Sequence, residues 1–286
     1  MLQPRLSQKI SHRVNGRFTF FLCDQLFSSE EAQALLNSFP SEKVEIVRAA
    51  GASHSTLSSI RHPDLFRQLL NESSQWREVC EWFMSREFVG DFLKTFRDPI
   101  LEKYPPVIRR VFQHWILNER RYYGEVQFSI RLTGSILSPH TDNADKVLAL
   151  IIYFPEENQS SDQGGTAFYL PKSWKSEIRI FRRYMRAGWL MPFGLRRLKS
   201  TKLPTVDGAD AIGAVGEHLE LFDREYQRVL DAPFKLGFAG GFIKNQFSWH
   251  DLRLHNYPPG QARRSLLVNV FLRPSKMRVI MDRIFS

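Results

Sequence analysis

The segment SPHTDNADKVLALIIYF, residues 138–154, decides how the rest of the chain is interpreted. Within it, His140 and Asp142 are separated by one residue, and side chains two apart along an extended strand point to the same side. The run that follows, residues 147–154, is rich in Val, Leu and Ile, as expected for a buried strand. An imidazole and a carboxylate that converge beside a core strand are half of a metal site, which needs at least one more ligand.

The composition is that of a folded protein. The 286 residues are 43% hydrophobic and contain no low-complexity tract, which excludes a disordered chain. Cys23 and Cys80 lie far apart and match no zinc or redox spacing. The N-terminus lacks the apolar core of a signal peptide, and no apolar run is long enough to span a membrane. We therefore expect a cytoplasmic protein.

Hydrophobic periodicity changes along the chain. Residues 1–120 are predicted to be mainly helical; Ser28 and Glu31 have the spacing of a capping box at the start of one helix, which Pro40 ends. From residue 122 the period becomes two, which predicts strands. The predicted strands cover residues 123–132, 147–154, 164–170, 234–245 and 263–272.

This order of elements predicts an α+β protein in which a sheet sandwich or barrel is flanked by helices. We interpret residues 1–286 as one domain. A helical support region covers about 1–120 and the strand core about 121–275, and a helical insert of about 172–233 interrupts the strands.

The third ligand is sought among the remaining histidines. His250 follows a predicted strand closely enough for a closing barrel to bring it back to His140 and Asp142, and His255 is the competitor. Two histidines and one carboxylate leave about three open positions on an octahedral iron, which is the arrangement of non-haem Fe(II) oxygenases. The other histidines are interpreted as hydrogen-bonded structural residues: His12, His54, His62, His114 and His218.

The segment RRSLLVNVF, residues 263–271, offers an anchor for a co-substrate. Strand alternation places Arg263, Ser265 and Asn269 on one face, which we expect to line the cavity. An arginine and a serine two residues apart can bind a carboxylate together. A register shifted by one residue would give this role to Arg264 instead.

In these elements the chain resembles the Fe(II)/2-oxoglutarate-dependent dioxygenases. The residues that carry the resemblance are His140-Thr141-Asp142, His250 and Arg263-Arg264-Ser265, in that order, over roughly residues 122–273. The resemblance implies a double-stranded β-helix (jelly-roll or cupin-like) core. It also implies Fe(II) bound by His140, Asp142 and His250, 2-oxoglutarate anchored by Arg263 (or Arg264) and Ser265, and O2 as oxidant. Because Asp142 occupies the carboxylate position, hydroxylation is favoured over halogenation.

Three residues that flank the metal motif are weaker candidates for substrate binding: Arg131, Asn143 and Lys146. For Arg131, a structural ion pair is favoured over contact with the substrate. The alternative for all of these candidate site residues is a barrel that binds no metal but has kept the sequence pattern of the metal and co-substrate sites.

The insert explains the charge of the protein. Residues 172–202 contain ten Lys or Arg and one acid, Glu177, and so carry +9 of the total charge of +10. Trp174, Ile178, Phe181, Met185 and Trp189 form one helical stripe, and basic residues form the opposite stripe. This pattern is typical of a helix that lies on an anionic membrane surface. A helix packed over the barrel with a solvated basic face is the alternative, and nucleic acid is disfavoured because the aromatic residues do not interleave with the cations.

The chain also resembles bacterial Kdo hydroxylases, which oxidise the sugar 3-deoxy-D-manno-octulosonic acid (Kdo) of the lipid A inner core. This implies an anionic glycolipid substrate, such as lipid A carrying Kdo, met at the inner face of the cytoplasmic membrane. Two alternatives remain open. One is a hydroxylase of a small metabolite, an amino acid or a peptidyl side chain, and the other is a non-catalytic peripheral membrane module on an oxygenase scaffold.

Overall fold

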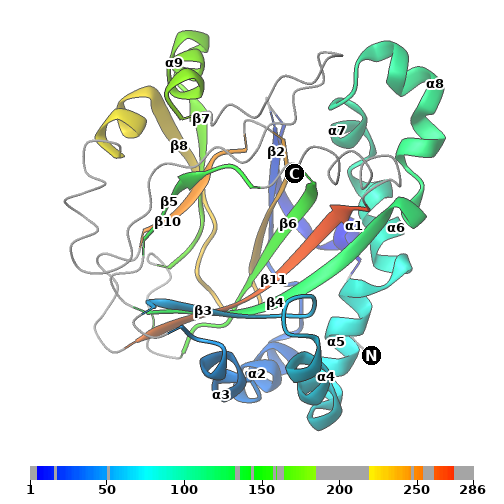
Figure 1. The fold of residues 1–286 in the computed structure, drawn as a ribbon, viewed down its shortest axis with the longest axis vertical. Helices are drawn as coiled ribbons and strands as arrows, with labels where there is room; N and C mark the ends of the chain where they lie inside the picture. The colour runs from blue at the N-terminus through cyan, green and yellow to red at the C-terminus, as the bar shows by residue number, and fades with distance from the viewer. Residues whose placement is uncertain are drawn as a thin grey trace, which may run out of the picture.

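The computed structural model describes residues 5–15, 18–49, 52–132, 136–142, 145–156, 159, 164–184, 219–245, 248–253 and 261–273. Figure 1 shows two sheets with helices around them. The helices are α1 (Leu6–Lys9), α2 (Ser29–Asn37), α3 (Ser41–Ile46), α4 (Pro63–Glu72), α5 (Ser74–Met84), α6 (Arg86–Thr95), α7 (Arg97–Leu101), α8 (Pro106–Ile116), the 3-10 helix η1 (Glu119–Arg121) and α9 (Trp174–Tyr184). The strands are β1 (Ile10–Asn15), β2 (Thr19–Cys23), β3 (His54–Ser58), β4 (Tyr122–Leu132), β5 (Ile136–His140), β6 (Lys146–Tyr153), β7 (Ala167–Pro171), β8 (Tyr226–Asp231), β9 (Ala239–Ile243), β10 (His250–Arg253) and β11 (Ala262–Leu272).

Serine caps mark the start of three N-terminal helices, α2, α5 and α6. The capping box at Ser28 and Glu31 is confirmed at the start of α2, where each side chain bonds the backbone N–H of the other residue. The helical pattern over residues 62–96 is divided into three helices, because Ser73 and Ser85 leave the helical conformation and cap α5 and α6.

The strand order identifies the barrel. The larger sheet has the order β1-β2-β9-β6-β11-β4-β3 and the smaller one β5-β10-β7-β8, and all neighbouring strands are antiparallel. Along the chain, β4 to β11 pass back and forth between the two sheets. This winding is a double-stranded β-helix, so the predicted fold class is confirmed.

The N-terminal region differs from the expectation of a mainly helical support. Its strands β1 and β2 extend the larger sheet beyond β9, and β3 extends it beyond β4. The helical insert also ends earlier than expected, because β8 lies inside the range 172–233 and pairs with β7. Both β3 and β8 are edge strands of mixed polarity, which weakens the alternation that predicts a strand.

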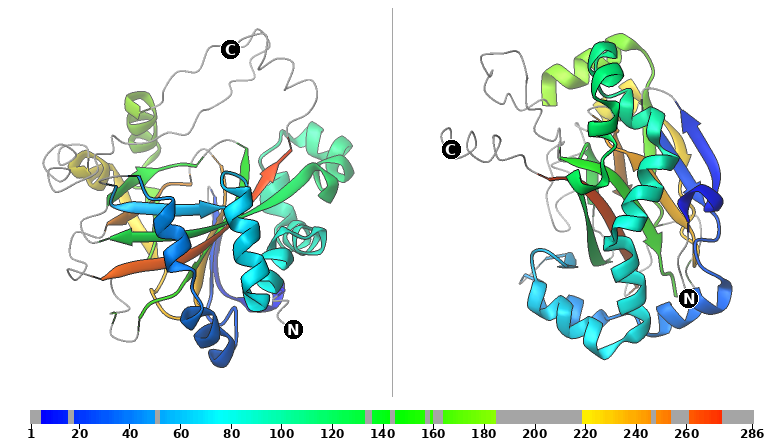
Figure 2. Two further views of the ribbon diagram at one scale, coloured as in Figure 1. Left: turned by 60° about the horizontal axis from the view of Figure 1, so that its bottom comes forward. Right: turned by 90° about the vertical axis from the view of Figure 1, so that its right-hand side faces the viewer.

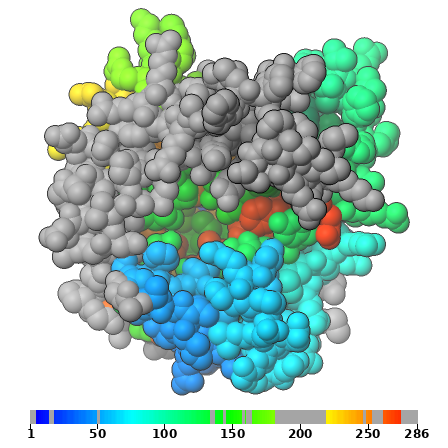
Figure 3. Space-filling view, viewed as in Figure 1, coloured from blue at the N-terminus to red at the C-terminus, as the bar shows by residue number. Residues whose placement is uncertain are grey.

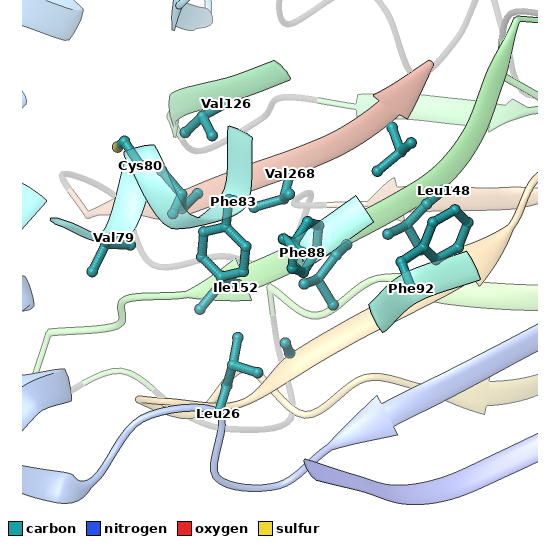
Figure 4. Packing of buried hydrophobic residues seen from close by; sticks show 14 of the residues in the cluster. Leu26, Val79, Cys80, Phe83, Phe88, Phe92, Val126, Leu148, Ile152 and Val268 are labelled. Carbon is teal, nitrogen blue, oxygen red and sulfur yellow. The ribbon is translucent and has the colours of Figure 1, made fainter. Parts of the chain in front are cut away.

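The outer face of the larger sheet is covered by the N-terminal helices. Phe128 on β4 lies 4.8 Å from Trp76 of α5, measured between ring centroids, and Phe39 and Phe66 also contact it. Figure 4 shows Phe83, Phe88 and other residues of these helices packed on β4, β6 and β11. This apolar layer is the main core, and Figure 2 shows the helices that form it from two further directions.

The space between the two sheets holds a smaller core. Ala149, Ile151 and Tyr153 of β6 face inwards, whereas Leu148, Leu150 and Ile152 pack against the helices. On β11, Leu266, Val268 and Val270 belong to the helix side, so the alternating residues Arg263, Ser265, Leu267 and Asn269 belong to the inner side. The polar face of residues 263–271 therefore lines the interior, as predicted.

Candidate metal centre

His140, Asp142 and His250 form a cluster whose ligand atoms all lie within 4.8 Å of one another. His140 is the last residue of β5, and His250 is the first residue of β10 and its direct partner across the two strands. Asp142 follows β5 by two residues. The barrel therefore brings together the three residues that the sequence predicts as metal ligands.

Both imidazoles are oriented by the backbone. Nδ1 of His140 lies 3.0 Å from the carbonyl oxygen of Ser138, and Nδ1 of His250 lies 3.0 Å from that of Ser248. Because a carbonyl only accepts, both Nδ1 atoms carry the proton and both Nε2 atoms present a lone pair. These Nε2 atoms lie 3.8 and 4.0 Å from the carboxylate oxygens of Asp142, which leaves space for an ion between them.

Burial keeps these groups in the states that a metal requires. It lowers the pKa of His140 well below the usual value, with a further contribution from His250, and it also lowers the pKa of His250. For Asp142, burial opposes ionisation, but Lys146 and the two imidazoles outweigh it and hold the pKa below its usual range. Two neutral imidazoles and one carboxylate are the donor set of a divalent transition metal and fit ferrous iron.

Two lysines lie beside the cluster. Nζ of Lys146, the first residue of β6, is 3.0 Å from Oδ2 of Asp142. Lys244 directly follows β9, has 5% of its surface exposed, and donates from Nζ to the carbonyl oxygen of Asn245. Burial and, to a lesser extent, Lys146 lower the pKa of Lys244 to about 8, although Asp142 acts in the opposite direction. Lys244 is therefore still largely protonated at neutral pH.

Inside the same barrel, Arg263 and Ser265 form a second polar group. Arg263 is 3% exposed and donates from one terminal nitrogen to Oγ of Ser265, at 3.1 Å. Its Nε donates to the carbonyl oxygen of Gly164, a residue with a φ of 89°. The guanidinium carbon lies 5.2 Å from the centre of the Tyr153 ring. These contacts fix the direction of the guanidinium group.

The next residue along the strand points elsewhere. Arg264 pairs with Glu156 at 2.6 Å, and its side chain is 23% exposed. Arg131, a candidate for substrate contact, lies directly opposite Arg263 in the β4–β11 ladder. Asn143 and His255 lie outside the described residues.

Sequence reasoning missed Lys244 and Tyr153. Tyr153 is fully buried and its hydroxyl donates to Oγ1 of Thr166 at 3.0 Å, while the guanidinium group of Arg263 lies by its ring. In the sequence, Tyr153 is one apolar-looking residue in a run of eight, and Lys244 stands at the end of a strand, where a lysine is usually solvated. Strand alternation could have identified Tyr153, because it places Tyr153 on the same inward face of the strand as Ala149 and Ile151. No comparable signal identifies Lys244.

Within the basic segment 172–202, residues 172–184 are described and contain helix α9. Its buried side contains Ile180, which packs with Tyr226 and Trp249 on the outer face of the smaller sheet. Trp174 and Ile178, which the sequence places on the apolar stripe, are 61% and 39% exposed, and Arg179 pairs with Glu225. The helix therefore packs on the barrel with a different face from the predicted stripe. Met185, Trp189 and the other residues up to 218 lie outside the described residues.

None of the helices in the described ranges has both the length and the apolar character to cross a membrane.

Comparisons with known proteins give structural likeness only. No family model and no curated protein matches the chain. A prolyl-4-hydroxylase from Pseudomonas putida is 13% identical, with a TM-score of 0.41, and the match covers 94% of this chain and 100% of that one. EvdO2 from Micromonospora carbonacea var. aurantiaca is 14% identical, with a TM-score of 0.44, and the match covers 90% of this chain and 87% of that one. HygX from Streptomyces hygroscopicus, solved with nickel and 2-oxoglutarate, is 11% identical, with a TM-score of 0.41, and the match covers 89% of this chain and 82% of that one. Because identities and TM-scores are low, the functional case rests on the side chains of this chain.

Proposed function

We propose that the protein is an Fe(II)- and 2-oxoglutarate-dependent dioxygenase that hydroxylates an anionic substrate. The observation that carries this proposal is the convergence of His140, Asp142 and His250 at one end of a double-stranded β-helix, with Arg263 and Ser265 buried in the same barrel. Aromatic rings connect the two groups. Phe242 lies 4.4 Å from His250 and 5.9 Å from Phe168, which belongs to the same inner core as Tyr153.

Each group has a definite role in this proposal. The Nε2 atoms of His140 and His250 and the carboxylate of Asp142 would hold the iron, and a set of three protein ligands would leave coordination positions for other ligands. Arg263 and Ser265 bind the distal carboxylate of the keto acid by charge-assisted and hydroxyl hydrogen bonds. The apolar rings between them exclude water from the interior. When bound, iron with the keto acid and O2 supplies the oxidation of a C–H bond to an alcohol, and the keto acid is converted to succinate and carbon dioxide.

The two lysines favour an anionic substrate. Lys146 and Lys244 face a site that contains one described carboxylate, Asp142, and a divalent ion would add further positive charge. A buried site with excess positive charge attracts a carboxylate or phosphate group and orients it near the metal. Lys146 would in addition hold the free oxygen of Asp142.

The reaction is tested by incubating the purified protein with Fe(II), 2-oxoglutarate and O2 and measuring succinate. The proposal predicts succinate formation that depends on O2 and is lost in Asp142→Ala. A matched control is Asp145→Ala, which removes a nearby carboxylate outside the ligand cluster. If the wild-type protein forms no succinate, the proposal fails and the non-catalytic alternative is favoured.

The specific anionic substrate that we propose is Kdo carried on lipid A and presented at a membrane. Its carboxylate and the lipid A phosphates suit Lys146 and Lys244, and the basic segment 172–202 would contact the bilayer, with Trp174 and Ile178 exposed on α9. Incubation with lipid A that carries Kdo, followed by mass spectrometry, should show the addition of one oxygen atom. If only small anionic metabolites, amino acids or peptides gain oxygen, the alternative hydroxylase is correct.

A further inference from the structure

Helix α8 presents its apolar side to the outside. Five large apolar side chains are exposed, by the following fractions: Val107 72%, Ile108 38%, Val111 65%, Phe112 47% and Trp115 53%. The side that faces the protein has Arg109 and Gln113, both partly buried, and fully buried Ile116. A surface helix normally has the opposite arrangement, so this stripe indicates a surface that binds something.

The outward orientation is fixed by contacts at the C-terminal half of the helix. Gln113 accepts a hydrogen bond from Arg97 at 3.0 Å, and the carbonyl oxygen of Ile116 accepts one from the hydroxyl of Tyr122 at 2.6 Å. The guanidinium carbon of Arg121 lies 3.2 Å from the centre of the Trp115 ring. The backbone of Phe112 is not helical, so α8 is kinked at this residue of the stripe. The exposed side chains are thus held by a helix that is anchored to the barrel.

The stripe lies at the same end of the barrel as the metal ligands. After η1, which follows α8, strand β4 begins at Tyr122, which pairs with Leu272. The neighbouring Phe271 pairs with Lys146, the contact of Asp142. Helix α9 starts beside this end too, because β7 leads into it past the His250 end of β10. Figure 1 and the right view of Figure 2 both place α8 and α9 at the top of the molecule, and Figure 3 shows both at its periphery.

The positive charge around the stripe indicates which kind of partner the stripe binds. Helix α8 has no acid, and residues 104–123 contain four arginines, at 109, 110, 120 and 121, against Glu119. The C-terminal segment 274–286 is apolar enough to cover the stripe, but it has three basic residues and one acid, so its charge has the same sign. An apolar stripe with aromatic residues at one end and arginines beside it is complementary to the headgroup region of an anionic bilayer.

We propose that α8 is a membrane-docking helix whose stripe of Val107, Ile108, Val111, Phe112 and Trp115 inserts among the headgroups of an anionic phospholipid bilayer. Together with α9, it turns the metal-binding end of the barrel towards the membrane surface. The inference deepens the proposed function, because it explains how a membrane-presented substrate reaches the metal. The docking itself does not depend on the reaction.

The test is co-sedimentation of the full chain with vesicles of phosphatidylglycerol and phosphatidylcholine, compared with vesicles of phosphatidylcholine alone. The informative variant is Val107→Asp/Val111→Asp, because both side chains are more than half exposed and their replacement should not disturb the core. The matched control is Ile46→Asp, which alters an equally exposed residue (70%) on α3, at the opposite end of the molecule in Figure 1. Thermal unfolding of all three proteins checks that they are folded.

We expect the wild type and Ile46→Asp to bind the anionic vesicles, and the α8 variant to bind at least about tenfold more weakly. Equal binding by all three proteins, or none by the wild type, would overturn the inference. A wild type that is dimeric in solution and becomes monomeric in the α8 variant would also overturn it, in favour of a second copy covering the stripe. Turnover of 2-oxoglutarate, measured in the same variants without vesicles, should be unchanged; its absence in all of them refutes the oxygenase proposal and leaves the docking result standing.

Discussion

The substitution of Arg263 by lysine gives the sharpest test of the interior of the barrel. Arg263 is 3% exposed and its guanidinium is held by Ser265 and by the carbonyl oxygen of Gly164. A lysine keeps the charge but cannot make two parallel hydrogen bonds to a carboxylate. Loss of one charge-assisted hydrogen bond costs about 1.5–3 kcal/mol. At about 1.4 kcal/mol per factor of ten, this corresponds to an increase of about 10- to 150-fold in the Kd for 2-oxoglutarate.

The neighbouring Arg264→Lys is the matched control. Its side chain lies on the other face of β11 and pairs with Glu156, a partly exposed ion pair that contributes about 1 kcal/mol or less. The assay is anaerobic calorimetry of 2-oxoglutarate binding to the protein loaded with a divalent metal. We expect Arg264→Lys to change the Kd by less than about twofold. An unchanged Kd in Arg263→Lys, or a larger change in Arg264→Lys than in Arg263→Lys, would refute the assignment of the interior arginine as the anchor.

Three further predictions concern the core, the substrate and pH. Phe128→Ala should lower the free energy of unfolding by about 3–5 kcal/mol, because the fully buried ring contacts three aromatic rings; a loss below about 1 kcal/mol in urea denaturation would contradict this packing. Lys244→Gln should raise the KM for an anionic substrate while leaving the Kd for 2-oxoglutarate unchanged, and equal changes in both constants would argue against a substrate contact. The metal-free protein should lose stability as the pH falls below 6.5, because the unfolded chain binds protons that the buried His140 and His250 do not; urea denaturation between about pH 5 and 7.5 should show a flatter dependence in His140→Asn/His250→Asn.

The sequence could predict the site because strand geometry is strict. Alternation along β11 directly predicts the parity of Arg263, Ser265 and Asn269. The two-residue spacing also predicts that His140 and Asp142 lie together, although Asp142 lies two residues beyond the end of β5 in the structure. In the structure, the ligand atoms of His140, Asp142 and His250 lie within 4.8 Å of one another. Arg263, Ser265 and Asn269 lie on the inner side of β11. Strong apolar runs such as residues 147–154 likewise predict β6 reliably, because the strand is buried on both faces.

Other elements depend on contacts that are distant in the sequence. The strands β5 and β10 are short, with five and four residues, and are defined by their pairing with each other rather than by composition. The edge strand β3, with the sequence HSTLS, has little hydrophobic signal, and its pairing with β4 makes it a strand. For α8, periodicity predicts a helix but not which side faces the solvent, because polar contacts such as Gln113 with Arg97 decide the orientation.

The most direct test of the account is the stoichiometry of Fe(II) binding, measured by anaerobic equilibrium dialysis. The account predicts one ion per chain in the wild type and in His255→Ala, and a loss of binding in His140→Ala, Asp142→Ala and His250→Ala. These variants separate the two candidates for the third ligand, since His250 lies in the cluster that the structure shows. No stoichiometric binding by the wild type, or wild-type affinity in His250→Ala together with loss in His255→Ala, would contradict it.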